Sequence, residues 1–208
     1  TLQVRVEDAA GNTGTARTQA YTLDTTAPSS PGFVLASDTG TSSTDGITTV
    51  GTVNVTGLEA GATWQYSTNS GSTWSVGTGT SFTLAAGTYA AGTIRVRQTD
   101  SAGNIGTTGS SVSTIVVDTT APTTTVSTVS FSNDTGTSTT DFITRTSAQT
   151  ISGTLSAVVA SGEVVKVSID NGATWQTATT TVGANTYSLS GVTLSSSNTL
   201  QVRVEDAA

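Results

Sequence analysis

Aspartates are the residues of this sequence whose type and spacing point to chemistry. Nine of the 14 acidic residues fall within three short motifs that recur along the 208-residue chain. Random surface acidity would not concentrate in this way. Clustered carboxylates, with carbonyl and water oxygens, are the ligands that calcium prefers, so the motifs predict calcium sites. Their aspartates are Asp8, Asp24, Asp38, Asp45, Asp100, Asp118, Asp134, Asp141 and Asp206.

Each motif keeps its order and spacing when it recurs. The two Asp-Thr-Thr-Ala-Pro segments begin 94 residues apart, and the paired aspartates of the second motif are seven positions apart in both copies. We name these motifs the linker motif (Asp24–Pro28 and Asp118–Pro122), the double-Asp loop (Asp38–Asp45 and Asp134–Asp141) and the Asp-Asn turn (Asp8–Asn12 and Asp100–Asn104, beginning again at Asp206).

Several function classes are excluded by composition. The chain has no Cys, His or Met, so it lacks disulfides, the commonest general base and the usual ligands of zinc, copper and haem. Its net charge of −7 with only seven Lys and Arg leaves no basic patch for nucleic acid. No apolar run is long enough to insert this segment into a membrane. Without a nucleophile–base pair or a cofactor motif, we expect no enzyme.

The elements that must position the aspartates belong to internal repeats. Residues 1–10 are identical to residues 199–208, so the sequence looks like a window on a longer array of repeats. We expect residues 1–23 to be the last two strands of one repeat and residues 24–117 to form a complete repeat. Residues 118–208 would form a third repeat that lacks its final strand.

Short alternating apolar runs, separated by turn signals, predict an all-β protein without helices. The complete repeat has seven such runs, which is the pattern of an immunoglobulin-like β-sandwich. Pro28 and Pro122 fix the backbone where the chain enters a repeat, so the linkers should be stiff. The expected strands are Gly32–Ala36, Gly51–Gly57, Thr63–Ser67, Thr73–Val76, Ser81–Leu84, Gly92–Thr99 and Ser111–Val117, with Glu163–Ile169 in the third repeat.

If successive strands alternate in direction, four carboxylates meet at one junction between repeats. Asp38 and Asp45 lie at the end of the repeat from which Asp118 leaves, and Asp206 begins the facing turn of the next repeat. Without a cation these charges would repel one another. The preceding junction would hold Asp24, Asp100 and Asn104, the following one Asp134 and Asp141, and Asp8 marks the first turn.

Plainer interpretations of these residues stay open. Asp8 and Asp100 suit hairpin turns, in which Asp accepts bonds from its own loop, and Asp24 and Asp118 suit Asx turns. Asp170, before Asn171-Gly172, is predicted to be a turn residue. Three tryptophans, Trp64, Trp74 and Trp175, are predicted to pack in the core.

Together, the linker motifs, double-Asp loops and Asp-Asn turns resemble bacterial Ig-like tandem repeats of giant secreted RTX-type biofilm adhesins. The resemblance covers nearly the whole chain. It implies an extracellular or cell-surface stalk, in contact with neighbouring repeats and stiffened by calcium at the junctions. Two alternatives remain, a module that binds glycan or protein, and a self-associating subunit of an extracellular filament.

Overall fold

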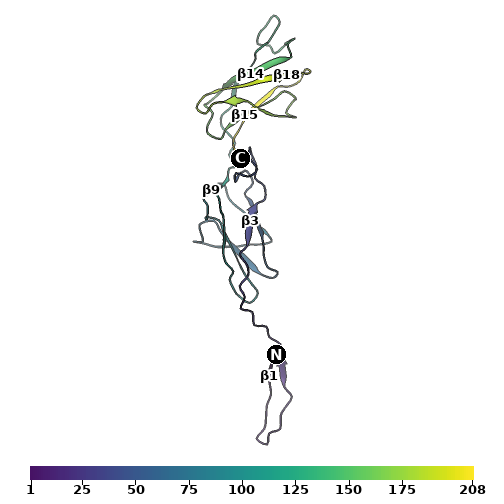
Figure 1. Cartoon of the computed structure of the whole chain (residues 1–208), viewed down its shortest axis with the longest axis vertical. Coiled ribbons are helices and arrows are strands. Elements are labelled where there is room, and N and C mark those ends of the chain that lie inside the picture. Colours follow the sequence, from purple (N-terminus) through teal and green to yellow (C-terminus); the bar gives the residue numbers. More distant parts are fainter. The chain divides into compact units, whose positions relative to one another are not determined.

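The computed structural model describes all 208 residues, and it is entirely β-structure. Nineteen strands form six sheets of two to four strands (Figure 1). None of the elements is a helix of the length and hydrophobicity needed to cross a membrane. The prediction of an all-β protein is therefore confirmed.

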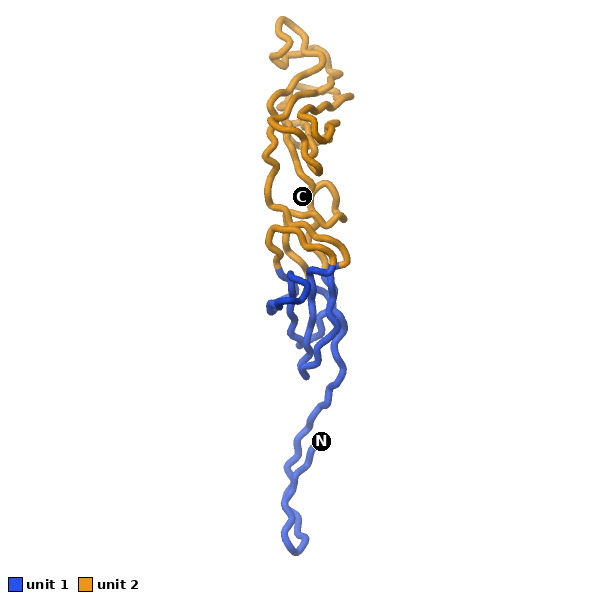
Figure 2. Tube along the Cα trace, turned by 90° about the vertical axis from the view of Figure 1, so that its left-hand side faces the viewer, with its two compact units in different colours: residues 1–33, 55–82, 92–111 blue, residues 34–54, 83–91, 112–208 orange.

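The chain divides into two compact units, coloured separately in Figure 2. Unit 1 comprises residues 1–33, 55–82 and 92–111, and unit 2 comprises residues 34–54, 83–91 and 112–208. Strands β3 (Gly32–Leu35), β5 (Thr52–Thr56) and β8 (Ser81–Thr83), which form one sheet, have residues in both units. The repeat boundaries expected at residues 24 and 118 stay predictions.

Unit 1 contains a separate hairpin and a four-stranded sheet. In the hairpin, Leu2 lies opposite Gln19 and Val4 opposite Arg17. In the larger sheet, the residues of Arg95–Thr99 alternate between half-exposed and buried positions, as the period of two along a strand requires. The strands are β1 (Leu2–Val4) and β2 (Arg17–Gln19) in the hairpin, and β11 (Gly109–Ser110), β10 (Arg95–Thr99), β6 (Thr63–Ser67) and β7 (Ser75–Val76) in sheet order.

An aromatic cluster fills the buried side of this sheet. Trp64 is 5% exposed, and its ring centroid lies 6.2 Å from that of Phe82, which stacks on Tyr66 at 4.3 Å. The Trp64 indole N–H donates to the carbonyl of Gly79 at 3.0 Å. Gly77 lies directly against the ring, with no room for a Cβ. The predicted core position of Trp64 is confirmed.

A buried glutamine holds the chain where it enters the complete repeat. Gln98 is fully buried, and its amide donates to the carbonyls of Ser29 and Gly57 at 2.9 and 3.0 Å. Its carbonyl oxygen accepts from the backbone N–H of Glu59 at 2.8 Å. All its polar atoms have partners, which is the condition for burying an amide at low cost.

Unit 2 contains a small sheet in which β12 (Ile115–Val117) lies between β4 (Ile47–Thr48), to which it is parallel, and β9 (Gly87–Tyr89), to which it is antiparallel. The expected strand Ser111–Val117 is therefore wrong in its extent. The chain instead forms β11 in one sheet and β12 in another. With β4 and β9 also present, residues 32–117 contain ten strands rather than seven.

Residues 126–205 form two sheets around one core. The buried side chains Ile151, Leu155 and Tyr187 come from one sheet, and Val165 and Val167 from the other, which gives a sandwich-like arrangement. The sheets are β13 (Val126–Phe131), β14 (Ala148–Leu155), β18 (Thr186–Thr193) and β17 (Thr179–Thr180), and β16 (Gln176–Thr177), β15 (Val164–Ser168) and β19 (Gln201–Glu205), each in sheet order.

Tyr187 links this core to the edge of its sheet. Its hydroxyl donates to the carbonyl of Thr128 at 3.0 Å, and burial raises the pKa of the phenol to about 12. Gly153 lies between these two groups, where any side chain would collide with the carbonyl of Thr128. The requirement for glycine at this position follows from that close approach.

Candidate functional site

The first double-Asp loop has one carboxylate oxygen without a partner. Asp38 accepts the backbone N–H of Gly46 on Oδ2 at 3.0 Å, and Asp45 accepts that of Ile47 on Oδ1 at 3.0 Å. The Oδ1 atom of Asp38 is buried and makes no hydrogen bond. A buried carboxylate oxygen without a donor is costly, so this atom is a candidate ligand for a cation.

The second double-Asp loop repeats this arrangement. Asp134 accepts the N–H of Phe142 on Oδ2 at 3.0 Å, Asp141 accepts that of Ile143 on Oδ1 at 3.0 Å, and Asp134 Oδ1 is buried without a partner. These are the only two buried side-chain polar atoms in the structure that lack a hydrogen bond. Their equivalence shows that the orphaned oxygen is a property of the motif.

Both linker motifs begin with an Asx turn. Asp24 Oδ1 accepts the N–H of Thr26 at 3.0 Å, and Asp118 Oδ1 accepts that of Thr120 at 2.9 Å. The second oxygen of each carboxylate makes no hydrogen bond in the structure. The Asx interpretation is confirmed, and it leaves one oxygen of each aspartate free for another ligand.

In the Asp-Asn turns, by contrast, both carboxylate oxygens are satisfied. Asp100 Oδ1 accepts the N–H groups of Ala102 and Asn104, and Oδ2 accepts the Asn104 amide at 2.8 Å. Asp8 makes the same bonds with Ala10 and Asn12. These hydrogen bonds, chiefly that from the asparagine side chain, lower the pKa of both aspartates. Their geometry is that of a braced turn.

The Asn104 amide also reaches the linker motif. It donates to the backbone carbonyl of Asp24 at 3.2 Å as well as to Asp100. The structure thus places Asp24, Asp100 and Asn104 together, as the sequence predicts for this junction. The contact is a hydrogen bond between the turn and the linker rather than a cluster of open carboxylates.

The residues expected to form a junction around Asp118 and Asp206 lie within unit 2. Gly40 lies beside them. A cavity of about 540 Å³ is lined by residues that include Asp118, Asp206 and Gly40. Gly40 has φ of +89°, and a Cβ there would lie 2.0 Å from the carbonyl oxygen of Ala207. Asp206 Oδ1 accepts the N–H of Ala208 at 3.0 Å. Linker, double-Asp loop and final turn therefore meet here.

Asp38 and Asp45 belong to the same loop as Gly40 but do not line this cavity. No group of three or more His, Cys, Asp or Glu side chains is placed to hold a metal ion. The carboxylates of Asp118 and Asp206 and the carbonyl of Ala207 close to Gly40 are oxygen donors of the kind that calcium prefers, whereas the orphaned oxygen of Asp38 is not part of this lining. The calcium sites stay predictions.

Asp170 is the turn residue that the sequence predicts. Its carboxylate accepts from the backbone N–H of Thr174 at 2.8 Å and from the hydroxyls of Thr174 and Ser168. Bonds from Thr174, then Ser168, lower the pKa of Asp170 to about 2. Asn171 and Gly172 both have positive φ, 62° and 85°, and form the centre of a tight turn from Asp170 to Ala173. This turn lies within the longer connection between the paired residues Val167 and Gln176, so it is not the two-residue hairpin that the sequence suggests.

Two tryptophans predicted for the core lie instead on the outer surface. Trp74 and Trp175 are half-buried, and a guanidinium covers each ring: Arg97 at 4.1 Å from the centroid and Arg203 at 3.9 Å. They are not core residues because the turn directs them onto the outward-facing arginine of the neighbouring strand. Each turn tryptophan is accompanied by an arginine at an outward-facing position of a later strand. This recurrence is the sequence signal for the cation–π pair.

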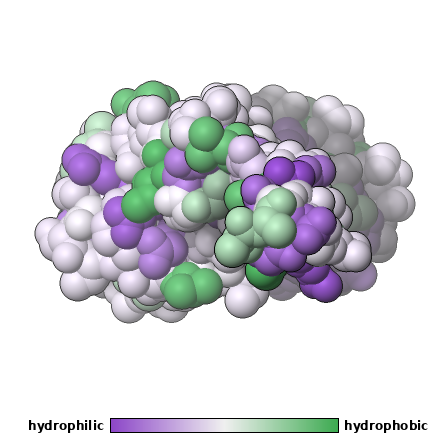
Figure 3. Space-filling model, turned by 90° about the horizontal axis from the view of Figure 1, so that it is seen from below, coloured by the Kyte–Doolittle hydropathy of each residue, from purple (hydrophilic) through white to green (hydrophobic).

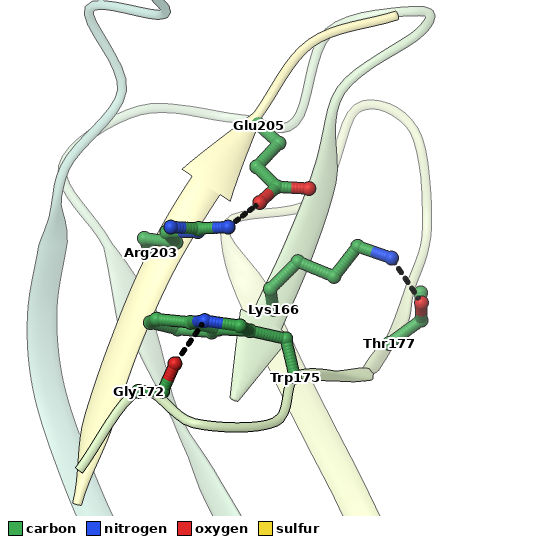
Figure 4. A network of polar contacts seen from close by, with 6 residues as sticks. All are labelled: Lys166, Gly172, Trp175, Thr177, Arg203 and Glu205. Atoms are coloured by element: carbon green, nitrogen blue, oxygen red, sulfur yellow. Dashed lines mark hydrogen bonds and ion pairs between the residues drawn. The ribbon is translucent and has the colours of Figure 1, made fainter. Parts of the chain in front are cut away.

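Figure 4 shows the second of these pairs. Arg203 lies over the ring of Trp175 and forms an ion pair with Glu205 on the same strand. The indole N–H donates to the carbonyl of Gly172 at 3.1 Å. Lys166 extends beside them to the hydroxyl of Thr177 at 2.7 Å. The arrangement fastens the turn to the sheet and presents a polar, partly aromatic surface.

The chain matches no protein-family model, and a search of curated proteins finds no match.

Proposed function

We propose that this chain is a stalk segment of a bacterial cell-surface adhesin or extracellular fibre, built from tandem Ig-like β-sandwich repeats joined by Pro-containing linkers. In this proposal the chain is extracellular and has no catalytic role, and its repeats hold a more distant binding region away from the cell. Identical motifs in successive repeats support a mechanical role, because recognition sites tend to differ in their loops from the scaffold.

The observation that carries the proposal is the buried, unpartnered Oδ1 of Asp38 and of Asp134. Two copies of one loop keep the same unsatisfied oxygen, although such an atom destabilises the fold unless something binds it. We assign calcium to this role. Asp38 and Asp118, which each keep an oxygen without a partner, would hold it together with backbone carbonyls, and the bound ion would stiffen the junction by fixing the loop to the linker.

The test is thermal unfolding of the 208-residue chain with calcium and with a chelator. Extracellular calcium modules bind with Kd of about 0.1–1 mM. At a calcium concentration of about ten times Kd, binding adds about 1.4 kcal/mol to the free energy of unfolding. In a repeat of about 60–100 residues this raises Tm by about 5–10 °C. An equal ionic strength of sodium chloride controls for screening of the net charge of −7.

Variants test which residues are responsible for the calcium-dependent rise in Tm. Asp118→Asn combined with Asp38→Asn keeps the acceptor oxygens of both local turns and removes two charges, so the calcium-dependent rise in Tm should disappear. Asp170→Asn is the matched control, because Asp170 is saturated within its own turn. Identical melting curves for the wild-type chain in calcium and chelator would contradict the proposal.

The alternative of a glycan- or protein-binding module has one observation in its favour. Trp74 and Trp175 lie half-exposed beside arginines on the outer surface, where aromatic rings can stack on a ligand. Binding of a glycan or protein that is lost on Trp175→Ala would support it.

A further inference from the structure

The outer face of the sheet β11-β10-β6-β7 carries two arginines and no acidic side chain. Arg95 and Arg97 lie two positions apart on β10, whereas Val96 and Gln98 are buried in the core. Alternation along a strand therefore places both guanidinium groups on the outer side. None of the four strands contains Asp or Glu. Two of the seven cations of the chain thus stand together, although its net charge is −7.

Neither arginine takes part in an ion pair. Arg97 donates through Nε and Nη2 to the side-chain oxygen of Gln65, at 3.0 and 2.8 Å, and Arg95 donates through Nε to the carbonyl of Gly92 at 3.1 Å. An edge of a guanidinium with two N–H groups is the geometry that binds a carboxylate. In Arg97 a neutral amide oxygen occupies this edge, so the positive charge has no counter-ion.

Trp74 extends this surface with an aromatic ring and a free donor. The guanidinium of Arg97 lies 4.1 Å from its ring centroid. The indole N–H of Trp175 donates to a carbonyl, but that of Trp74 makes no hydrogen bond with the chain. Gly71 lies between the ring and Arg95, because a Cβ there would be 3.5 Å from both Trp74 Cζ2 and Arg95 Nη1. The two arginines and the indole therefore form one continuous surface.

The equivalent sheet β16-β15-β19 neutralises its own charge. The arginine over its turn tryptophan, Arg203, forms an ion pair with Glu205 on the same strand (Figure 4). Thr99 occupies the position of Glu205 in the complete repeat, and Gln201 stands where the complete repeat has Arg95. The same arrangement of tryptophan and arginine thus has an internal counter-ion in one sheet and none in the other. The sheet without one is open to an anion from outside.

The other side chains of the face indicate the class of anion. Val76, opposite Gln65, is the only aliphatic side chain on the outer side of these strands. A protein partner needs an apolar centre to its interface, which this face lacks. A sugar acid needs an aromatic ring to lie against, hydrogen-bonding groups for its hydroxyls and a guanidinium for its carboxylate. The face supplies all three, through Trp74, Gln65 and the two arginines.

We propose that the outer face of the sheet β11-β10-β6-β7 binds the carboxylate groups of an acidic polysaccharide. Arg95 and Arg97 pair with carboxylates of the bound chain, and a sugar ring lies against the exposed part of Trp74. Ion pairs at an exposed surface are individually weak and are screened by salt, so the affinity should depend on ionic strength. This binding goes beyond the stalk function, does not depend on calcium, and gives a ligand class to the surface around Trp74.

The first experiment is calorimetric titration of the 208-residue chain with oligogalacturonate, in chelator. The chain should bind it at least about tenfold more tightly than the uncharged methyl ester or poly-L-glutamate, because only oligogalacturonate combines carboxylates with sugar rings. Binding should weaken between about 0.1 and 1 M sodium chloride, over which the screening length falls from about 10 to 3 Å. No binding at low salt, or equal binding of the ester or of poly-L-glutamate, overturns the proposal.

Thr99→Glu tests the role of the missing counter-ion. It gives Arg97 the carboxylate that Arg203 has, leaves ring and guanidinium in place, and should lower the affinity for oligogalacturonate at least about tenfold. Arg95→Gln should also lower it. Arg145→Gln is the matched control, since it removes the same charge from an exposed arginine of unit 2, and it should bind as the wild type does. Melting curves show that each variant is folded. Unchanged affinity in Thr99→Glu overturns the assignment.

A reciprocal variant tests whether the contrast between the two sheets is the cause. Glu205→Thr combined with Gln201→Arg removes the counter-ion of Arg203 and rebuilds the proposed surface on β19. In the Thr99→Glu background, which blocks the first surface, these two substitutions should restore binding of oligogalacturonate. A triple variant that is folded and does not bind contradicts the proposal.

Because these titrations run in chelator, their failure leaves the calcium proposal untouched. Conversely, melting curves that do not respond to calcium would leave polysaccharide binding standing.

Discussion

At the residue scale, the aspartates of this chain divide by what their oxygens bind, and the division follows the sequence motifs. Asp8, Asp100 and Asp170 saturate their carboxylates within one turn. Asp38 and Asp118 each keep an oxygen with no partner. The first kind stabilises a turn because the bonds favour the charged form. Only the second kind is free to recruit a cation.

Asp170 allows a sharp test of the first kind. Its folded pKa of about 2 lies below the ordinary 3.8, so its bonds stabilise the fold above about pH 4, and this contribution is lost as the pH falls towards 2. In the complete repeat Asn69 occupies the equivalent position and accepts from Thr73 N–H and Ser67 hydroxyl at 2.9 and 2.8 Å. Asp170→Asn should therefore keep stability at pH 7 and flatten the loss below pH 4.

Urea unfolding followed at several pH values measures this effect. Asp170→Ala, which has no acceptor, should be destabilised at pH 7 and should approach the wild-type chain as the pH falls to 2. Parallel pH dependence in the wild-type chain and the Asn variant would show that other carboxylates dominate acid unfolding.

At the scale of elements, the sequence predicts strands that alternate in burial and misses strands that depend on distant partners. Thr63–Ser67 has the predicted bounds because its β-branched and aromatic residues and the turn after it are local signals. Strands β4 and β9 are two and three residues long and exist through pairing with β12. No local pattern indicates that the chain crosses between sheets after β11.

The features of the candidate site also fall into those that local sequence predicts and those that depend on distant residues. The Asx turns and the turn at Asp170 follow from local residue types, so the sequence predicts them. The approach of Gly40 to the carbonyl of Ala207 joins residues far apart in the chain, and nothing in the loop sequence alone indicates it. The outward orientation of Trp74 and Trp175 depends on an arginine of another strand, which a hydrophobicity pattern does not contain.

The pairing of β4 with β12 makes a testable demand on Gly46. A Cβ there would lie 2.8 Å from the carbonyl oxygen of Thr114, whereas a Cβ at Gly61 would meet nothing within 4 Å. Both glycines have positive φ, 77° and 81°. Gly61→Ala should therefore cost about 1–2 kcal/mol from backbone strain alone, and Gly46→Ala should cost about 1–3 kcal/mol more from crowding.

Chemical denaturation of the two alanine variants gives these differences in the free energy of unfolding. Equal losses for Gly46→Ala and Gly61→Ala would mean that β4 moves away from β12 without penalty.

At the scale of the whole molecule, the small apolar content limits how the proposed repeats can be held rigid relative to one another. Hydrophobic residues make up 34% of the chain, and there are no disulfides. The exposed apolar residues lie in separate small groups among hydrophilic ones on the face shown in Figure 3. In the proposed stalk, rigidity between repeats would come from linkers, polar contacts and bound calcium rather than from a large apolar interface.

The last prediction concerns that rigidity. If calcium fixes the double-Asp loop to the linker, the repeats lose freedom to move about the linker. Solution scattering of the 208-residue chain should then show a narrower distribution of conformations, with a longer maximum dimension, in calcium than in chelator. Asp38→Asn with Asp118→Asn should make the two curves coincide. A calcium response that survives both substitutions would place the ion elsewhere in the chain.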